Sequence, residues 1–208
     1  MRYFVTTAVL FSSILCFNVT LKAQHPFEFG FSLGAITSQV DGDSYGGYNK
    51  SGLHGGAWVS RRFGENFAYM LEIAYRQKGS KSSFNANDEE LDYYRLRLNY
   101  VEVPITLRYH YKRYLFDISA GIAYLTKGKE EGYIYGFWQS SDITEFNDFD
   151  FVVAAGIGFN INEYWSIKAR FTYSVFDAAK KYIPPKPVKY NGQFNNDLSI
   201  TLYRKIGK

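Results

Sequence analysis

The feature that most constrains the fold is an alternation of apolar and polar residues with a period of two. In segment 67–76 the odd-numbered residues are large and apolar, whereas the even-numbered ones are mostly small or charged, and segment 165–175 repeats the pattern. A period of two places successive side chains on opposite faces of a β-strand. The same test predicts an all-β chain with strands at residues 27–38, 52–62, 67–78, 94–111, 114–126, 148–161, 164–176 and 196–206.

The connections between these strands alternate in length. Short turns lie near residues 64–66, 111–113 and 162–163. The other connections are long and polar, and they cover residues 39–51, 79–93, 127–147 and 177–195. Membrane barrels of bacteria have tight periplasmic turns and longer outward loops. We therefore predict an eight-stranded antiparallel up-and-down transmembrane β-barrel with both termini in the periplasm.

The first residues carry an export pattern. Arg2 gives a basic start, residues 4–21 are mainly apolar, and Ala23 supplies the small residue that precedes a signal-peptidase cut. We predict that residues 1–23 are a cleaved signal peptide and that residues 24–208 form one outer-membrane β-barrel domain. The alternative is an uncleaved anchor helix, although the apolar stretch is short for a bilayer span and is interrupted by polar residues.

The cysteine content and the length of the apolar runs exclude several classes of protein. Cys16 is the only cysteine, and it lies inside the predicted signal peptide, so the mature chain has no thiol for a disulfide, a nucleophile or a metal site. After residue 24 the longest clean apolar run covers about 152–159, which is too short for a membrane helix. The formal charge of +4 falls to +2 when Arg2 and Lys22 are removed. This small excess predicts no nucleic-acid partner.

Alternation alone leaves open which face points inward, because a soluble barrel such as a lipocalin keeps its apolar face inside. Residue size favours the opposite arrangement. Tyr and Phe, which number 19 and 18, concentrate on the apolar face, and tall aromatic side chains belong against lipid tails and headgroups. The polar face carries small residues that fit a narrow lumen, namely Gly34, Gly56, Ala74, Gly121, Ala123, Ala154, Gly156 and Gly158.

Charged residues of both signs also lie on the predicted inner face. Buried charges persist only when they are paired and hydrogen-bonded, so we predict an interior salt-bridge network. Such a network would plug an eight-stranded lumen and leave no continuous water channel. The predicted members are Glu28, Arg62, Glu72, Arg76, Glu102, Arg108, Asp117, Lys168 and Arg170.

The strand predicted at 94–111 is longer than a membrane crossing requires. Its first part, with Arg95, Arg97 and Asn99, is expected to project beyond the bilayer. Pro104 lacks a backbone donor, and a local bulge is therefore expected there.

The sequence contains few candidates for chemistry. His25, His54 and His110 are scattered, so no metal site is predicted. Ser51 and His54 do not make a complete triad, but they leave a lipid-modifying enzyme open as an alternative. Residues 41–46 begin like a calcium loop but lack its later ligands. We predict no catalytic residue, no cofactor and no enzymatic activity.

Three stretches together carry a resemblance to a known family. They are residues 39–43 with 47–52, residues 72–80, and residues 100–105. Over the mature chain they resemble the PorT-like outer-membrane β-barrel family of Bacteroidota, whose members are described as porin-family proteins, some of them linked to protein secretion. The resemblance implies an outer-membrane barrel and no catalytic residues. The C-terminus departs from many outer-membrane barrels, because residues 206–208 contain no terminal aromatic residue.

These observations predict a barrel with a structural or interaction role. The expected partners are outer-membrane lipid, lipopolysaccharide and a protein of the cell envelope. Basic residues in the loop 177–195 are placed to contact lipopolysaccharide headgroups, although a solvated hairpin tip explains them equally well. The alternative functions are a lipid-modifying enzyme and a small-solute channel.

Overall fold

The computed structural model describes residues 26–43, 45–82, 93–134, 137–140, 145–181 and 192–206. The predicted signal peptide, residues 1–23, lies outside this part of the chain. The strands are β1 (Phe27–Asp41), β2 (Lys50–Phe63), β3 (Phe67–Lys81), β4 (Tyr93–Tyr111), β5 (Tyr114–Ile134), β6 (Phe137–Ser140), β7 (Glu145–Phe146), β8 (Phe149–Asn160), β9 (Trp165–Ser174), β10 (Ala179–Lys181) and β11 (Phe194–Lys205).

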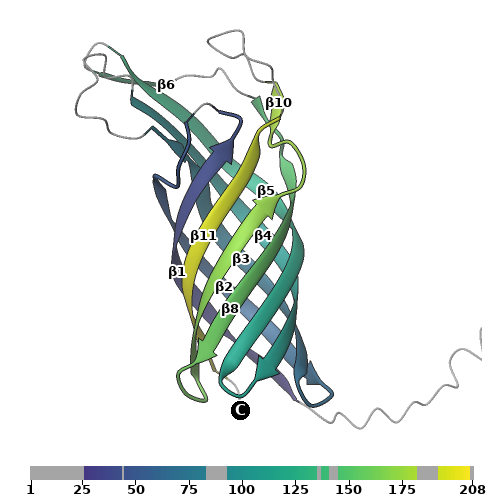
Figure 1. Ribbon diagram of the computed structural model, residues 1–208. Helices are drawn as coiled ribbons and strands as arrows, with labels where there is room; N and C mark the ends of the chain where they lie inside the picture. The colour runs from purple at the N-terminus through teal and green to yellow at the C-terminus, as the bar shows by residue number, and fades with distance from the viewer. Residues whose placement is uncertain are drawn as a thin grey trace, which may run out of the picture.

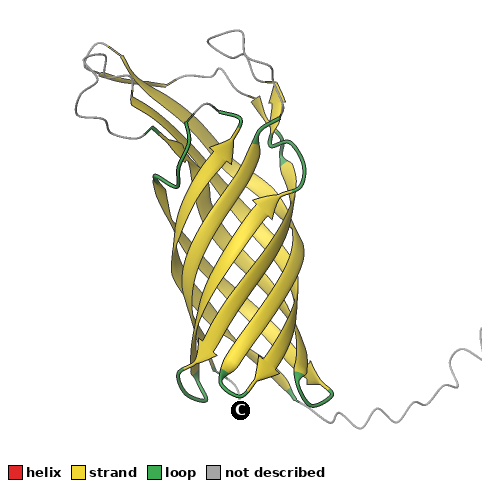
Figure 2. Cartoon of the chain, viewed as in Figure 1, coloured by secondary structure: helices red, strands yellow, loops and turns green. Residues whose placement is uncertain are grey.

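Eight of these strands close into a barrel (Figure 1). Strands β1 to β5, β8, β9 and β11 each pair antiparallel with the next, and β11 pairs back to β1 through a register that runs from Gly30 opposite Lys205 to Asp41 opposite Phe194. The described part of the chain is almost entirely strand and turn, as Figure 2 shows. The predicted eight-stranded antiparallel barrel is confirmed. Strand β6 pairs antiparallel with the last residues of β5. Strand β7 pairs with β10 in a small separate sheet.

The two ends of the barrel differ. The short turns between β2 and β3, β4 and β5, and β8 and β9 gather at the end that also holds the C-terminus (Figure 1). The longer connections, with β6, β7 and β10, lie at the opposite end. We call these the short-turn end and the long-loop end.

The outer surface of the barrel is apolar. Its exposed residues include Phe31, Leu33, Ile105, Ile118 and Ile200, and Leu33 reaches 70% exposure. A soluble monomer rarely exposes an apolar belt of this extent, whereas a bilayer supplies the hydrocarbon that such a belt requires. Within the described ranges no helix is long and apolar enough to cross a membrane.

The prediction of a bulge at Pro104 is wrong. Leu71 opposite Ile105 and Ala74 opposite Glu102 share one register, so β3 and β4 continue in phase on both sides of the proline. A missing donor removes one ladder bond but requires no additional residue. The irregularity lies instead between β4 and β5.

That irregularity is a β-bulge at Thr126. Tyr100 lies opposite Leu125, but the preceding Asn99 lies opposite Lys127, which leaves Thr126 as an additional residue in β5. One additional residue reverses which parity faces outward. Beyond the bulge, Lys127 and Lys129 therefore face the outside of the barrel, where an uninterrupted strand would turn them inward.

Candidate functional site

Charged side chains fill the lumen at mid-height. The structure places seven of the nine predicted network residues there, buried and within ion-pair distance of an opposite charge: Glu72, Arg76, Glu102, Arg108, Asp117, Lys168 and Arg170. Three further members come from the same inner faces, and none of them is among the residues predicted from the sequence: His54, Lys78 and Asp197.

The charged residues of the lumen form three groups, and the first surrounds Glu72 of β3. The hydroxyl of Ser32 donates to Glu72 Oε1 at 2.7 Å, and Arg170 Nη2 lies 3.3 Å from Oε2. The Tyr203 hydroxyl lies 3.2 Å from both Glu72 Oε2 and Arg170 Nη2. With His54 of β2, the carboxylate has partners from four other strands, which satisfies the requirement that a buried charge be paired and hydrogen-bonded.

The second group lies toward the long-loop end. Arg76 Nε is 3.2 Å from Glu102 Oε2, and a second guanidinium nitrogen of Arg76 contacts Asp197. Lys78 contacts Glu102 and lies 3.3 Å from Asp197 Oδ2. Two cations of β3 therefore share two carboxylates, one from β4 and one from β11.

The third group lies toward the short-turn end. Arg108 holds Asp117 with two bonds, Nε to Oδ1 at 2.9 Å and Nη2 to Oδ2 at 3.0 Å. Lys168 Nζ is 2.7 Å from the same carboxylate and sits over the Tyr203 ring, 4.0 Å from its centroid. The bidentate arginine geometry is the strong form of this contact.

His54 and Tyr203 connect the three groups. Nε2 of His54 lies 3.3 Å from Glu72, and its Nδ1 lies 3.1 Å from Arg76 Nη1. Tyr203 bonds the first group through its hydroxyl and contacts Lys168 of the third through its ring. The charged residues therefore form one continuous network across the lumen.

Two predicted network residues lie elsewhere. Arg62 is exposed at the end of β2, with no ion pair among the described residues. Glu28 is half-buried near the start of β1 and pairs with Lys205 at 3.2 Å. Both face inward by parity, but parity carries no information on depth, and both lie at the short-turn mouth.

The buried Ser32, His54 and Glu72 do not have the geometry of a catalytic triad. Ser32 Oγ lies 3.1 Å from His54 Nε2, and Glu72 contacts that same nitrogen. In a triad the serine and the acid use opposite ring nitrogens. Here Arg76, which can only donate, bonds His54 Nδ1, so Nδ1 is the acceptor nitrogen of the ring. The proton is therefore on Nε2, which cannot accept a second proton from Ser32. Ser51 is exposed, three residues from buried His54 along β2, so the two face opposite sides.

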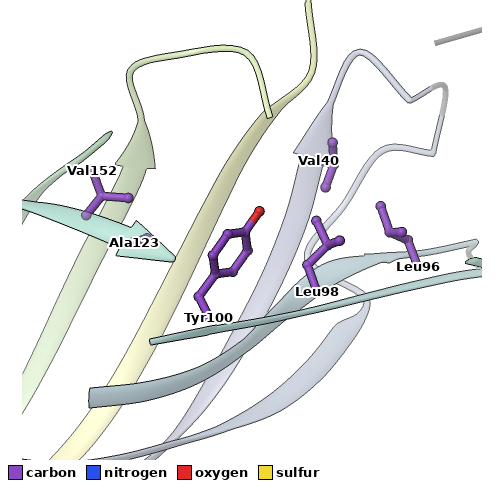
Figure 3. Packing of buried hydrophobic residues seen from close by; sticks show 6 residues of the cluster. All are labelled: Val40, Leu96, Leu98, Tyr100, Ala123 and Val152. Carbon is purple, nitrogen blue, oxygen red and sulfur yellow. The ribbon is translucent and has the colours of Figure 1, made fainter. Parts of the chain in front are cut away.

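An apolar cluster closes the lumen above the network. It consists of Val40, Leu96, Leu98, Tyr100, Ala123 and Val152, all buried, and Figure 3 shows these side chains from four strands turned toward one another. Asn195 donates to the Tyr100 hydroxyl at 3.2 Å, so the one polar atom of the cluster is satisfied. Beyond it, burial raises the pKa of the Asp43 carboxyl, in the first loop, to about 6.

A cationic patch covers the outer face at the long-loop end. The bulge at Thr126 aligns Lys81, Arg95 and Glu131 in one cross-strand row and Arg97 with Lys129 in the next. With Lys127, we call the five basic residues Lys81, Arg95, Arg97, Lys127 and Lys129 the outer cationic patch. Glu131 lies among them, within 3.0 Å of Arg95, 3.4 Å of Arg97 and 2.6 Å of Lys129. The hydrogen bond from Lys129 lowers the pKa of Glu131.

No metal site is evident in the described part of the chain, where no three His, Cys, Asp or Glu side chains converge. His54 belongs to the network, His110 lines the short-turn mouth, and His25 lies outside the described residues.

Residues 20–180 match the family described as outer membrane protein beta-barrel domain. The chain belongs to this family. It is therefore an outer-membrane β-barrel protein, as its apolar belt and closed strand ring indicate. No curated protein matches the sequence.

Solved structures share the fold of this family member. The attachment invasion locus protein Ail of Yersinia pestis is 16% identical, with a TM-score of 0.51, over 86% of this chain and 98% of that one. Neisserial surface protein A is 10% identical, with a TM-score of 0.54, over 86% of this chain and 97% of that one. At these identities the likeness concerns the fold alone.

Proposed function

We propose that this outer-membrane protein is a sealed barrel with a structural or interaction role and no enzymatic activity. The observation that carries the proposal is the filled lumen. Arg76, Lys78 and Lys168 are each 1% exposed, and Tyr100 is fully buried above them. Between the network and the apolar cluster, a lumen packed with paired charges and capped by apolar side chains offers no path for a solute and no space for a substrate.

We propose an orientation with both termini in the periplasm and with residues 1–23 removed as a signal peptide. Long connections at one end and short turns at the other support this orientation, because membrane barrels place their short turns in the periplasm. Within the wider barrel family, the motifs at 39–52, 72–80 and 100–105 support a PorT-like assignment.

The interaction partner we propose is the anionic headgroup layer of lipopolysaccharide. The outer cationic patch supports this partner because it lies on the outer faces of β4 and β5 next to the apolar belt. Val101 and Tyr124 are the last apolar residues of that belt on these two strands. The patch holds five basic residues, and three of them, Arg95, Arg97 and Lys129, pair with Glu131. Basic residues at a membrane surface attract anionic lipid. Most of the loop 177–195 lies outside the described residues. An envelope protein that binds the long-loop end is the further partner.

The channel alternative is tested by conductance across planar bilayers. We expect purified, folded protein to give no steady conductance, because the network and the apolar cluster block the lumen. The control is the heat-dependent shift of electrophoretic migration that marks a folded barrel, measured on the protein recovered from the same bilayer preparation. A reproducible steady conductance from folded protein would refute the sealed lumen and favour a channel.

A further inference from the structure

A cavity of about 550 Å³ opens at the short-turn mouth, which is periplasmic in the proposed orientation. Its lining comes from β1, β2, β4 and β11 and from the turns between β4 and β5 and between β8 and β9. This volume lies in the range of sites that hold one small ligand. The Arg108–Asp117 pair lies at its inner wall, so the cavity ends where the buried network begins.

Two arginines of this cavity have no carboxylate partner among the described residues. Arg62 lies opposite Ala68, and Ala68 lies opposite Arg108, so Arg62 and Arg108 share a face with one small side chain between them. Arg108 is committed to Asp117, but Arg62 has no ion pair within the described ranges. The same holds for Arg113, in the turn between β4 and β5.

The carboxylates of the lining do not offset these charges. Glu28 is already paired with Lys205 at 3.2 Å, which leaves Glu163 as the remaining acid against Arg62 and Arg113. Guanidinium groups bind carboxylates in a bidentate geometry and remain charged at any physiological pH. The mouth therefore offers donors to an oxyanion.

The inner wall is aromatic. Trp58 and Tyr203 both line the cavity, and their polar atoms are already used. Trp58 Nε1 donates to the Phe31 carbonyl at 3.2 Å, and the Tyr203 hydroxyl bonds Glu72 and Arg170. These two residues present ring carbons to the cavity, apart from the part of the Tyr203 ring that Lys168 covers, and ring surfaces favour an apolar or aromatic group.

We propose that this mouth cavity binds a carboxylate carried on an apolar or aromatic group that enters from the periplasm. Arg62 and Arg113 hold the carboxylate, and Trp58 and Tyr203 contact the apolar part. Two sources supply this chemistry, a free organic acid and the C-terminal carboxylate of a peptide.

Calorimetric titration of the folded protein in detergent micelles tests the proposal. The probes are N-acetylphenylalanine and an N-acetylated tripeptide that ends in phenylalanine, each as the free acid and as the amide. We expect saturable binding of at least one acid and no binding of its amide. Binding of the single amino acid identifies a free organic acid as the ligand, and binding of the tripeptide alone identifies a peptide end.

The variants supply the matched control. We expect R62A/R113A to weaken acid binding by about tenfold or more, because each charge-assisted bond to a carboxylate is lost. R61A removes the same charge one position away, where Arg61 lies over the Phe27 ring and outside the cavity lining, and should leave binding unchanged. Equal binding of acid and amide, equal loss in R61A, or no saturation by either acid would overturn the proposal.

Discussion

R76A is expected to lower the free energy of unfolding by about 4 kcal/mol, because removal of one partner from a buried ion pair leaves an uncompensated charge. Arg76 is 1% exposed and contacts both Glu102 and Asp197. Lys78 touches the same two carboxylates, but one ammonium cannot neutralise both. Denaturant titration of the barrel in lipid vesicles or micelles measures the change.

The control for R76A is R61A on the outer face. Arg61 contacts the Phe27 ring at 5.2 Å and no carboxylate among the described residues, so its loss is expected to cost less than about 1 kcal/mol. The double variant R76A/D197N removes one of the unpaired charges, and it should be more stable than R76A alone. If R76A and R61A destabilise equally, the network does not hold the barrel together.

R97A/K129A is expected to weaken binding to purified lipopolysaccharide about 30-fold at low ionic strength, given about 1 kcal/mol for each basic residue at an anionic surface. Arg97 and Lys129 lie opposite each other in the outer cationic patch, and their side chains are 44% and 43% exposed. Surface plasmon resonance on the immobilised barrel measures the affinity. The loss should shrink as salt is added, because exposed charges are screened.

Two further variants separate the patch from general charge. R61A/R204A removes two basic residues from the outer face at the opposite end, where Arg204 lies over Tyr164 and Trp165, and should leave the affinity unchanged. Deletion of Thr126 removes the bulge but leaves Lys127 opposite Asn99, directly after the inward-facing Leu125, so Lys127 and Lys129 still face outward and the affinity should stay unchanged. Unchanged affinity in R97A/K129A would contradict lipopolysaccharide contact at this site.

The strands of the membrane-spanning barrel could be predicted because alternation is strict wherever one face meets lipid. The bulge explains why the predicted strand ends at residue 126, whereas β5 continues to Ile134. An additional residue reverses the parity, so a period-two pattern stops at that point although the hydrogen-bonded strand does not.

The lumen could be predicted only in part because parity identifies the face of a residue and not its depth. Arg62 faces inward but lies at the mouth, outside the enclosed region. Lys78 and Asp197 have the inner parity of β3 and β11, but they lie at the ends of the predicted strands, where the pattern does not separate a strand from the loop beside it. His54 is considered from the sequence only as a metal ligand or with Ser51, whereas the residue is buried beside Glu72 and Arg76.

The central claim is that the apolar outer face meets hydrocarbon while the charged face is enclosed. Nitroxide labels at I105C, I118C and I200C sample three strands of the outer face, and a label at K129C samples the level of the patch. Collision rates with oxygen and with a water-soluble nickel chelate, measured in lipid vesicles, report the environment of each label. We predict that oxygen dominates at the three isoleucine positions and that the chelate dominates at position 129. Dominant access of the chelate at positions 105, 118 and 200 would contradict the membrane placement of this barrel.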